Sequence, residues 1–89
     1  MQKQYTITAS EGLHARPCTL LVTAATPFTS DIQISTGDRS GNLKSIMAVM
    51  TLGVTTGTTI TISAEGSDAQ EAINKISTVI TTEGIGVEA

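Results

Sequence analysis

The sequence predicts an α+β fold in which helices cover one face of an antiparallel sheet. Apolar and polar residues alternate in several short segments, as in half-buried strands, whereas two longer segments repeat their apolar positions every three or four residues, as in helices. The outward positions of the alternating segments are mostly Thr, Ser and Gln, although a parallel sheet buried on both faces requires continuous apolar runs. We therefore expect a four-stranded antiparallel sheet and three helices in the order β-α-β-β-α-β-α.

The first predicted elements are a strand and a helix. Residues 4–8 alternate, with Tyr5 and Ile7 facing inward, and the segment 10–12 ends the strand. From Pro17 the period becomes helical, since proline fits the first turn of a helix, and Pro27 marks the end of this helix. The inward face of the helix consists of Cys18, Leu21, Val22 and Ala25.

The middle of the chain is expected to form a hairpin and a short helix. Ile32 and Ile34 alternate with polar residues, and residues 36–38 make a turn into a short polar strand that ends near Leu43. Ser45 then precedes the apolar run 46–50, a pattern that is typical of a short helix with a serine N-cap.

The last predicted elements are again a strand and a helix. Residues 58–64 alternate with a period of two. Ser67 or Asp68 is expected to cap a final helix that ends before Gly84, and Glu71 and Lys75 are expected to pair one turn apart. The apolar stripe of this helix consists of Ala69, Ala72, Ile73, Ile76, Val79 and Ile80.

The composition disfavours several classes of function. The chain has 89 residues, which fits one domain over residues 1–89. Its net charge is -3 and its aromatic content is 2%, so it lacks the basic face and stacking side chains of a typical nucleic-acid-binding protein. No apolar run approaches the roughly 20 residues that span a bilayer, and no glycine-rich phosphate loop is present. We therefore expect no cofactor, no nucleic-acid partner and no membrane insertion.

Cys18 is the only cysteine of the chain. A single cysteine excludes an internal disulfide, and the absence of a signal-peptide pattern also favours a cytoplasmic location. One cysteine and one histidine do not make a structural zinc site, so no metal is expected. Because Cys18 lies on the core stripe of the first helix, we expect a packed thiol rather than a redox centre.

The only histidine, His14, lies where the first helix is about to begin. The first amides of a helix have no carbonyl partners and the helix dipole adds partial positive charge, so this position favours an anion. Gly12 lets the backbone turn just before the site, and Arg16 is near enough to hold the same anion. Pro17 has no amide, so the candidate donors are the amides of Ala15, Arg16 and Cys18. These residues fit a phosphohistidine and also a histidine that only satisfies a backbone group.

Two short motifs lie at a characteristic spacing in the chain. They are Leu13-His14-Ala15-Arg16-Pro17 and Asn42-Leu43-Lys44-Ser45-Ile46-Met47. Together they resemble the motifs of the HPr family, the histidine-containing phosphocarriers of the sugar phosphotransferase system. The similarity continues through residues 51–53 and 64–66 nearly to the end of the chain. A single five-residue motif can arise by chance, but two in register in a chain of this length are highly specific.

The resemblance implies both a fold and an activity. The family fold is an open-faced β-sandwich of four antiparallel strands and three helices, which agrees with the periodicity. The implied protein is a phosphoryl carrier, not an independent enzyme, and it is expected to act as a monomer. It would accept a phosphoryl group from enzyme I on Nδ1 of His14, assisted by Arg16, and donate it to sugar-specific enzyme IIA domains. The residues implied to support the phosphate are Gly12, Ala15, Pro17 and Cys18.

Ser45 has two interpretations. Serine is a preferred N-cap, which is sufficient to explain it. In HPr proteins of the low-GC Gram-positive type, however, the matching serine is the target of a dedicated HPr kinase/phosphorylase, and the modified form binds a catabolite-control transcription factor. The segment 44–47 resembles that type, so the resemblance implies regulation by phosphorylation of Ser45.

Partner proteins are expected to dock beside His14. A short helix cannot bury every side of a five-residue apolar run, so we expect Met47 and Met50 to be partly exposed and Val49 to be buried. The first helix has no lysine or arginine, so electrostatic steering is expected to be weak. The expected partner-binding residues are Leu20, Lys44, Ile46, Met47 and Met50.

Two other functions are compatible with the chain. One is a regulatory paralogue of the family that acts mainly through Ser45, although such a protein is expected to lack the histidine. The other is a generic α+β protein-interaction or RNA-binding module, which the fold alone does not exclude. The acidic charge and the lack of stacking aromatics count against RNA binding.

Overall fold

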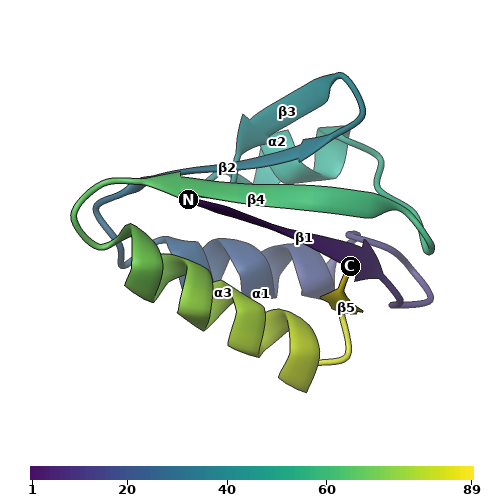
Figure 1. The fold of residues 1–89 in the computed structure, drawn as a ribbon. Helices are drawn as coiled ribbons and strands as arrows, with labels where there is room; N and C mark the ends of the chain where they lie inside the picture. Colours follow the sequence, from purple (N-terminus) through teal and green to yellow (C-terminus); the bar gives the residue numbers. More distant parts are fainter.

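The computed structural model describes residues 1–89 and has the predicted α+β architecture, with helices against an antiparallel sheet (Figure 1). The helices and strands follow one another in the predicted order β-α-β-β-α-β-α, and one further strand follows the last helix. The elements are β1 (Gln2–Ile7), α1 (Arg16–Ala25), β2 (Asp31–Thr36), β3 (Arg39–Asn42), α2 (Ile46–Thr51), β4 (Thr59–Glu65), α3 (Ala69–Thr82) and β5 (Gly86–Glu88).

The sheet has five strands in the order β3-β2-β4-β1-β5, and every neighbouring pair is antiparallel. The fifth strand corrects the prediction of four. β5 pairs with the end of β1, where Ile7 is opposite Gly86. A Cβ atom on Gly86 would lie 2.6 Å from the carbonyl oxygen of Thr6, so only glycine allows this close approach. Three residues that begin with glycine carry no alternating pattern, which is why the periodicity does not reveal this strand.

Two helices cover one face of the sheet. α1 and α3 lie side by side beneath β1 and β4, while the shorter α2 packs against α1 and near β3 (Figure 1). The predicted inward stripe of α1 is buried, and in α3 the central residues of the stripe are buried with Ala69 and Val79 half-buried at its margins. These side chains and the inward residues of the strands form one core, in which Tyr5 and Ser77 join β1 to α3 by a hydrogen bond between their hydroxyl groups.

The start of α3 differs from the prediction. Asp68 occupies the N-cap position, but its side chain makes no capping hydrogen bond. Its carboxylate instead accepts hydrogen bonds from the backbone amides of Thr29 and Ser30, at 2.9 and 3.0 Å, and from their hydroxyl groups. The hydroxyl of Ser30 and the amide of Thr29 hold the pKa of Asp68 at about 2. Asp68 therefore ties the start of α3 to the segment before β2.

Two further features of the fold bear on the predictions. Glu71 and Lys75 form no ion pair, so the prediction of a pair one turn apart on α3 is wrong. The helix does end where expected, because Glu83 is its C-cap and Gly84 follows with a φ of 70°. None of the helices is long and apolar enough to cross a membrane.

Candidate functional site

His14 lies in the loop between β1 and α1, and this loop contacts the backbone of Val54 at Gly12 and Leu13. Gly12 has a φ of 64°, and a Cβ atom there would lie 2.2 Å from the carbonyl oxygen of Val54. The amide of Leu13 donates to that same oxygen at 3.1 Å, and the Leu13 side chain is buried. The glycine therefore permits the close contact with Val54, and this contact fixes the backbone directly before His14, whose ring is exposed.

The backbone directly after His14 is strained. Ala15 has a φ of 45° and a ψ of -112°, and it is the only non-glycine residue of the chain with a positive φ. Conformations of this kind cost roughly 1–3 kcal/mol and occur most often at functional sites. Ala15 also occupies the N-cap position of α1, where it has no side chain to accept a hydrogen bond.

The start of α1 therefore has free donors. The amides of Ala15, Arg16 and Cys18 make no hydrogen bond in the structure. Pro17 between them has no amide and fits the first helical turn. An uncapped helix start with several unpaired amides attracts an anion, because the amides and the helix dipole both offer positive charge. These are the amides that the sequence singled out as candidate phosphate donors.

Arg16 is exposed and forms an ion pair with Glu83, a residue that no motif in the sequence indicates as part of the site. Its guanidinium donates to Oε1 of Glu83 at 3.0 Å, and the two side chains are 71% and 39% exposed. Glu83 follows the end of α3, so no local pattern links it to the histidine motif. A hollow of about 470 Å³ lies beside this pair. Its lining comes from three segments, residues 9–11, 15–17 and 83–85.

Cys18 connects the start of α1 to α2. Its side chain is fully buried, and Sγ donates to the carbonyl oxygen of Ile46 over 3.6 Å. Burial raises the pKa of the Cys18 thiol above its ordinary value, which keeps the sulfur protonated and unreactive. The thiol is packed, as its place on the core stripe predicts.

The predicted N-cap of α2 is present. Oγ of Ser45 accepts a hydrogen bond from the amide of Ala48 at 3.2 Å. The predicted division of the apolar run is also confirmed, since Val49 is buried whereas Met47 is 76% and Met50 41% exposed. Ile46 is 45% exposed. We call the surface formed by Ile46, Met47 and Met50 the α2 apolar face.

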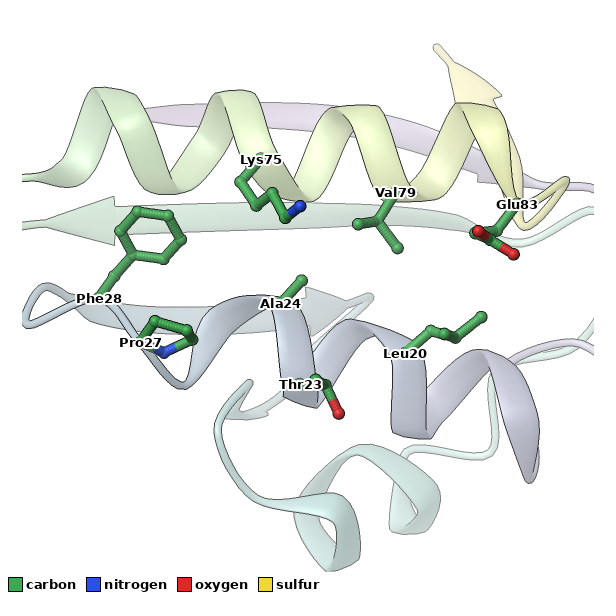
Figure 2. Close-up of a pocket in the computed structure, with 8 residues that line it drawn as sticks. All are labelled: Leu20, Thr23, Ala24, Pro27, Phe28, Lys75, Val79 and Glu83. Carbon is green, nitrogen blue, oxygen red and sulfur yellow. The ribbon is translucent and has the colours of Figure 1, made fainter.

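Two of the expected partner-binding residues are placed differently from the others. Leu20 follows Cys18 by two residues, which is about 200° around a helix, and it lines a groove between α1 and α3 (Figure 2). Leu20 is therefore not part of the α2 apolar face. The ammonium group of Lys44 donates to the carbonyl oxygen of Phe28 at 2.5 Å, so this side chain is engaged within the protein.

Comparison with known proteins identifies a family. A family model described as "PTS HPr component phosphorylation site" matches residues 1–82. The histidine-containing phosphocarrier protein of Mycoplasma is 45% identical in sequence, with a TM-score of 0.90, and the match covers 96% of this chain and 98% of that chain. The phosphocarrier protein HPr of Bacillus anthracis is 42% identical, with a TM-score of 0.82 and coverage of 89% and 94%.

A regulatory protein is also similar. Crh of Bacillus subtilis, described as a catabolite repression protein whose crystal structure is a domain-swapped dimer, is 42% identical to this chain. The match has a TM-score of 0.73 and covers 85% of this chain and 87% of that chain. Phosphocarriers and a catabolite-repression protein thus share the fold of this chain at comparable identity.

Proposed function

Because the chain belongs to the HPr family of phosphocarriers of the phosphotransferase system, we propose that it accepts a phosphoryl group on His14 from enzyme I and passes it to sugar-specific enzyme IIA domains. The protein acts as a cytoplasmic carrier within this relay and does not turn over alone. It performs the transfer as a monomer.

The observation that carries this proposal is the juxtaposition of an exposed histidine with unpaired donors at the start of α1. His14 is exposed, and the free amides of Ala15, Arg16 and Cys18 surround the beginning of the helix next to it. A phosphohistidine bears a dianionic group, which requires several donors within hydrogen-bond reach. These amides and the guanidinium of Arg16 supply such donors without any metal ion.

The transfer proceeds by in-line displacement at phosphorus. The lone pair of the neutral imidazole Nδ1 forms the new N–P bond while the bond from phosphorus to the donor group of enzyme I breaks. The enzyme IIA domain repeats the displacement from the other side, and His14 returns to its neutral form. Since Arg16 pairs with Glu83 in the unphosphorylated protein, its guanidinium exchanges the carboxylate for the phosphoryl oxygens during the transfer.

The proposal is tested by phosphorylating the purified chain with enzyme I and phosphoenolpyruvate. We expect wild-type protein to gain one acid-labile phosphate by intact-mass analysis and His14→Ala to gain none. The melting temperature of the variant should stay near that of wild type, because an exposed loop side chain contributes little packing. Labelling of a folded His14→Ala protein would show that the acceptor lies elsewhere.

We further propose that partners dock on the α2 apolar face. Met47, the most exposed of its residues, presents a flexible thioether that adapts to different surfaces. Since α1 has no basic residue after Arg16, docking relies on apolar contact more than on charge. We expect Met47→Asp to weaken association with enzyme I, and Val87→Asp to serve as the control, because Val87 is an exposed apolar residue on the edge strand β5.

Phosphorylation of Ser45 by an HPr kinase/phosphorylase is the proposed regulation, with a catabolite-control transcription factor as the partner of the modified form. Ser45 caps α2 and immediately precedes the α2 apolar face. A phosphate on Ser45 adds negative charge beside the α2 apolar face, which an acidic partner must desolvate when it docks. The start of α2 tolerates the phosphate, because negative charge at a helix N-terminus is favourable. We expect authentic phosphorylation to slow transfer from enzyme I and to leave the melting temperature equal or higher. Unchanged kinetics would reduce Ser45 to a structural cap.

The similarity to Crh supports a second candidate, a regulator that acts mainly through Ser45. The two candidates differ in whether His14 takes part in transfer. Labelling of His14 by enzyme I together with onward transfer to an enzyme IIA domain favours the carrier. A chain that is modified at Ser45 but not at His14 is a regulator.

A further inference from the structure

A groove of about 410 Å³ runs between α1 and α3 (Figure 2). It lies on the opposite side of α1 from α2, so it is separate from the α2 apolar face. Its volume falls within the range of about 300–1,000 Å³ that is typical of small-molecule sites. Its lining includes Leu20, Ala24 and Phe28 from α1 and the segment after it, and Lys75, Val79 and Glu83 from α3 and its C-cap.

The groove contains one charge without a partner. The ammonium group of Lys75 points between the two helices, and it makes no hydrogen bond or ion pair within the protein. The other charged residue of the lining, Glu83, is paired with Arg16. The groove therefore combines an apolar lining with a single available positive charge, which lies across from Ala24, between Phe28 and Val79 (Figure 2).

The dimensions of the groove suit a small ligand better than a protein. Eight residues line it, whereas a stable protein interface uses about 20–30 residues a side. The lining of α3 extends from Lys75 to Glu83, which is about 12 Å along a helix axis. A narrow, linear ligand fits this stretch of the groove, with its charged group beside Lys75 and its tail directed towards Leu20.

We propose that the groove binds a free linear amphiphile with an anionic head, of which a medium-chain carboxylate is the simplest example. The carboxylate accepts hydrogen bonds from Lys75, and the alkyl chain lies between Ala24 and Val79 towards Leu20. A charge-assisted hydrogen bond fixes the orientation and burial of the chain supplies the remaining affinity. Because the groove is open to solvent, the dissociation constant is on the order of 1 mM.

The test is a titration of the unphosphorylated, isotope-labelled full chain with octanoate, followed by NMR. We expect saturable shift changes in the amides of Leu20, Ala24, Lys75 and Val79. Lys75→Gln removes the charge and should weaken binding about tenfold, which is the effect of losing one charged hydrogen bond. Val79→Thr keeps the shape but adds a hydroxyl group, and it should weaken binding several-fold.

The matched control is Lys3→Gln, since Lys3 lies on β1 and pairs with Glu88 outside the groove. This variant should bind octanoate as the wild type does. Octyltrimethylammonium has the same tail with the opposite charge, and it should bind at least about tenfold more weakly. Non-saturating shifts, equal binding of the two amphiphiles, or equal weakening by Lys75→Gln and Lys3→Gln would each overturn the proposal. No phosphoryl donor takes part, so these outcomes are independent of the phosphocarrier proposal.

Discussion

Replacement of Gly12 by alanine is the sharpest test of how the loop before His14 is held. The left-handed φ of 64° costs an alanine about 1–2 kcal/mol. The added Cβ would also lie 2.2 Å from the carbonyl oxygen of Val54 and 2.9 Å from Cα of Thr55. Both are backbone atoms, so no change of rotamer relieves the overlap. Overlaps of this kind cost about 1–3 kcal/mol.

The loop is then expected to move away from Val54, which weakens the hydrogen bond from the Leu13 amide to that carbonyl oxygen. The unfavourable φ and the overlap together lower the free energy of unfolding by about 2–5 kcal/mol. A domain of this size has roughly 5–15 kcal/mol of stability, so Gly12→Ala should fold but unfold at a clearly lower urea concentration. Because Leu13 precedes His14, phosphorylation of His14 should also slow.

Gly37→Ala provides the matched control. Gly37 has a similar φ of 58°, but a Cβ atom there has nothing within 4 Å. Gly37→Ala should lower the free energy of unfolding only by the cost of the left-handed φ, about 1–2 kcal/mol, and its His14 should be phosphorylated at the normal rate. Urea unfolding and single-turnover labelling of the three proteins give both quantities. Equal stability of Gly12→Ala and Gly37→Ala would refute the role assigned to the contact with Val54.

Four further predictions concern single side chains. Arg16→Ala should slow labelling of His14 by roughly 10- to 1,000-fold in rapid-quench assays, and Arg16→Lys should recover only part of the lost rate. Full activity of Arg16→Ala would show that the helix amides alone are sufficient to hold the phosphoryl group. Glu83→Gln removes the ion pair of the Arg16 guanidinium, and an exposed ion pair is worth about 0.2–1 kcal/mol. Labelling of His14 should therefore accelerate by at most about fivefold. Slower labelling would contradict the proposed exchange of Glu83 for the phosphoryl oxygens as the partner of Arg16. Ser45→Ala should cost about 1 kcal/mol in denaturant unfolding through loss of the cap, while Ser45→Asp, which can still accept from the amide, should cost less. The low pKa of Asp68 stabilises the fold above about pH 4, and this contribution disappears as the pH falls towards 2. In urea unfolding, Asp68→Asn should therefore be less stable than wild type at pH 7 and nearly equal to it below pH 2. A difference in stability that does not change with pH would contradict this.

The sequence predicted those parts of the fold that local patterns specify. The inward positions of α1, the alternation of the strands and the cap at Ser45 depend on residues within one or two turns of each other, and the structure contains all of them. β5 and the role of Asp68 depend on segments distant in the sequence. A carboxylate at a helix start can cap its own helix or bind a neighbouring segment, and only the approach of the Thr29–Ser30 backbone decides between these.

The candidate site shows the same division. The motif around His14 indicated an anion site, and the amides expected to be free are unpaired. The positive φ of Ala15 has no local signal, because alanine rarely adopts it and the surrounding contacts must impose it. The pairing of Arg16 with Glu83 joins residues 67 positions apart. The sequence therefore indicated which residues make up the candidate site, whereas tertiary contacts decide how their side chains and backbone are held.

The position of β1 in the sheet has a consequence for co-translational folding. β1 is synthesised before its partner strands β4 and β5, which lie more than 50 residues later in the chain. At translation rates of 5–20 residues per second, the interval from Ile7 to Thr59 is roughly 3–10 s. During that time Tyr5 and Ile7 have neither their strand partners nor α3 to cover them, and an unpaired apolar strand is a template for pairing with another chain. The nascent chain is thus most vulnerable to intermolecular association before β4 and α3 exist, and its need for a chaperone should fall once residues 59–82 have left the ribosome.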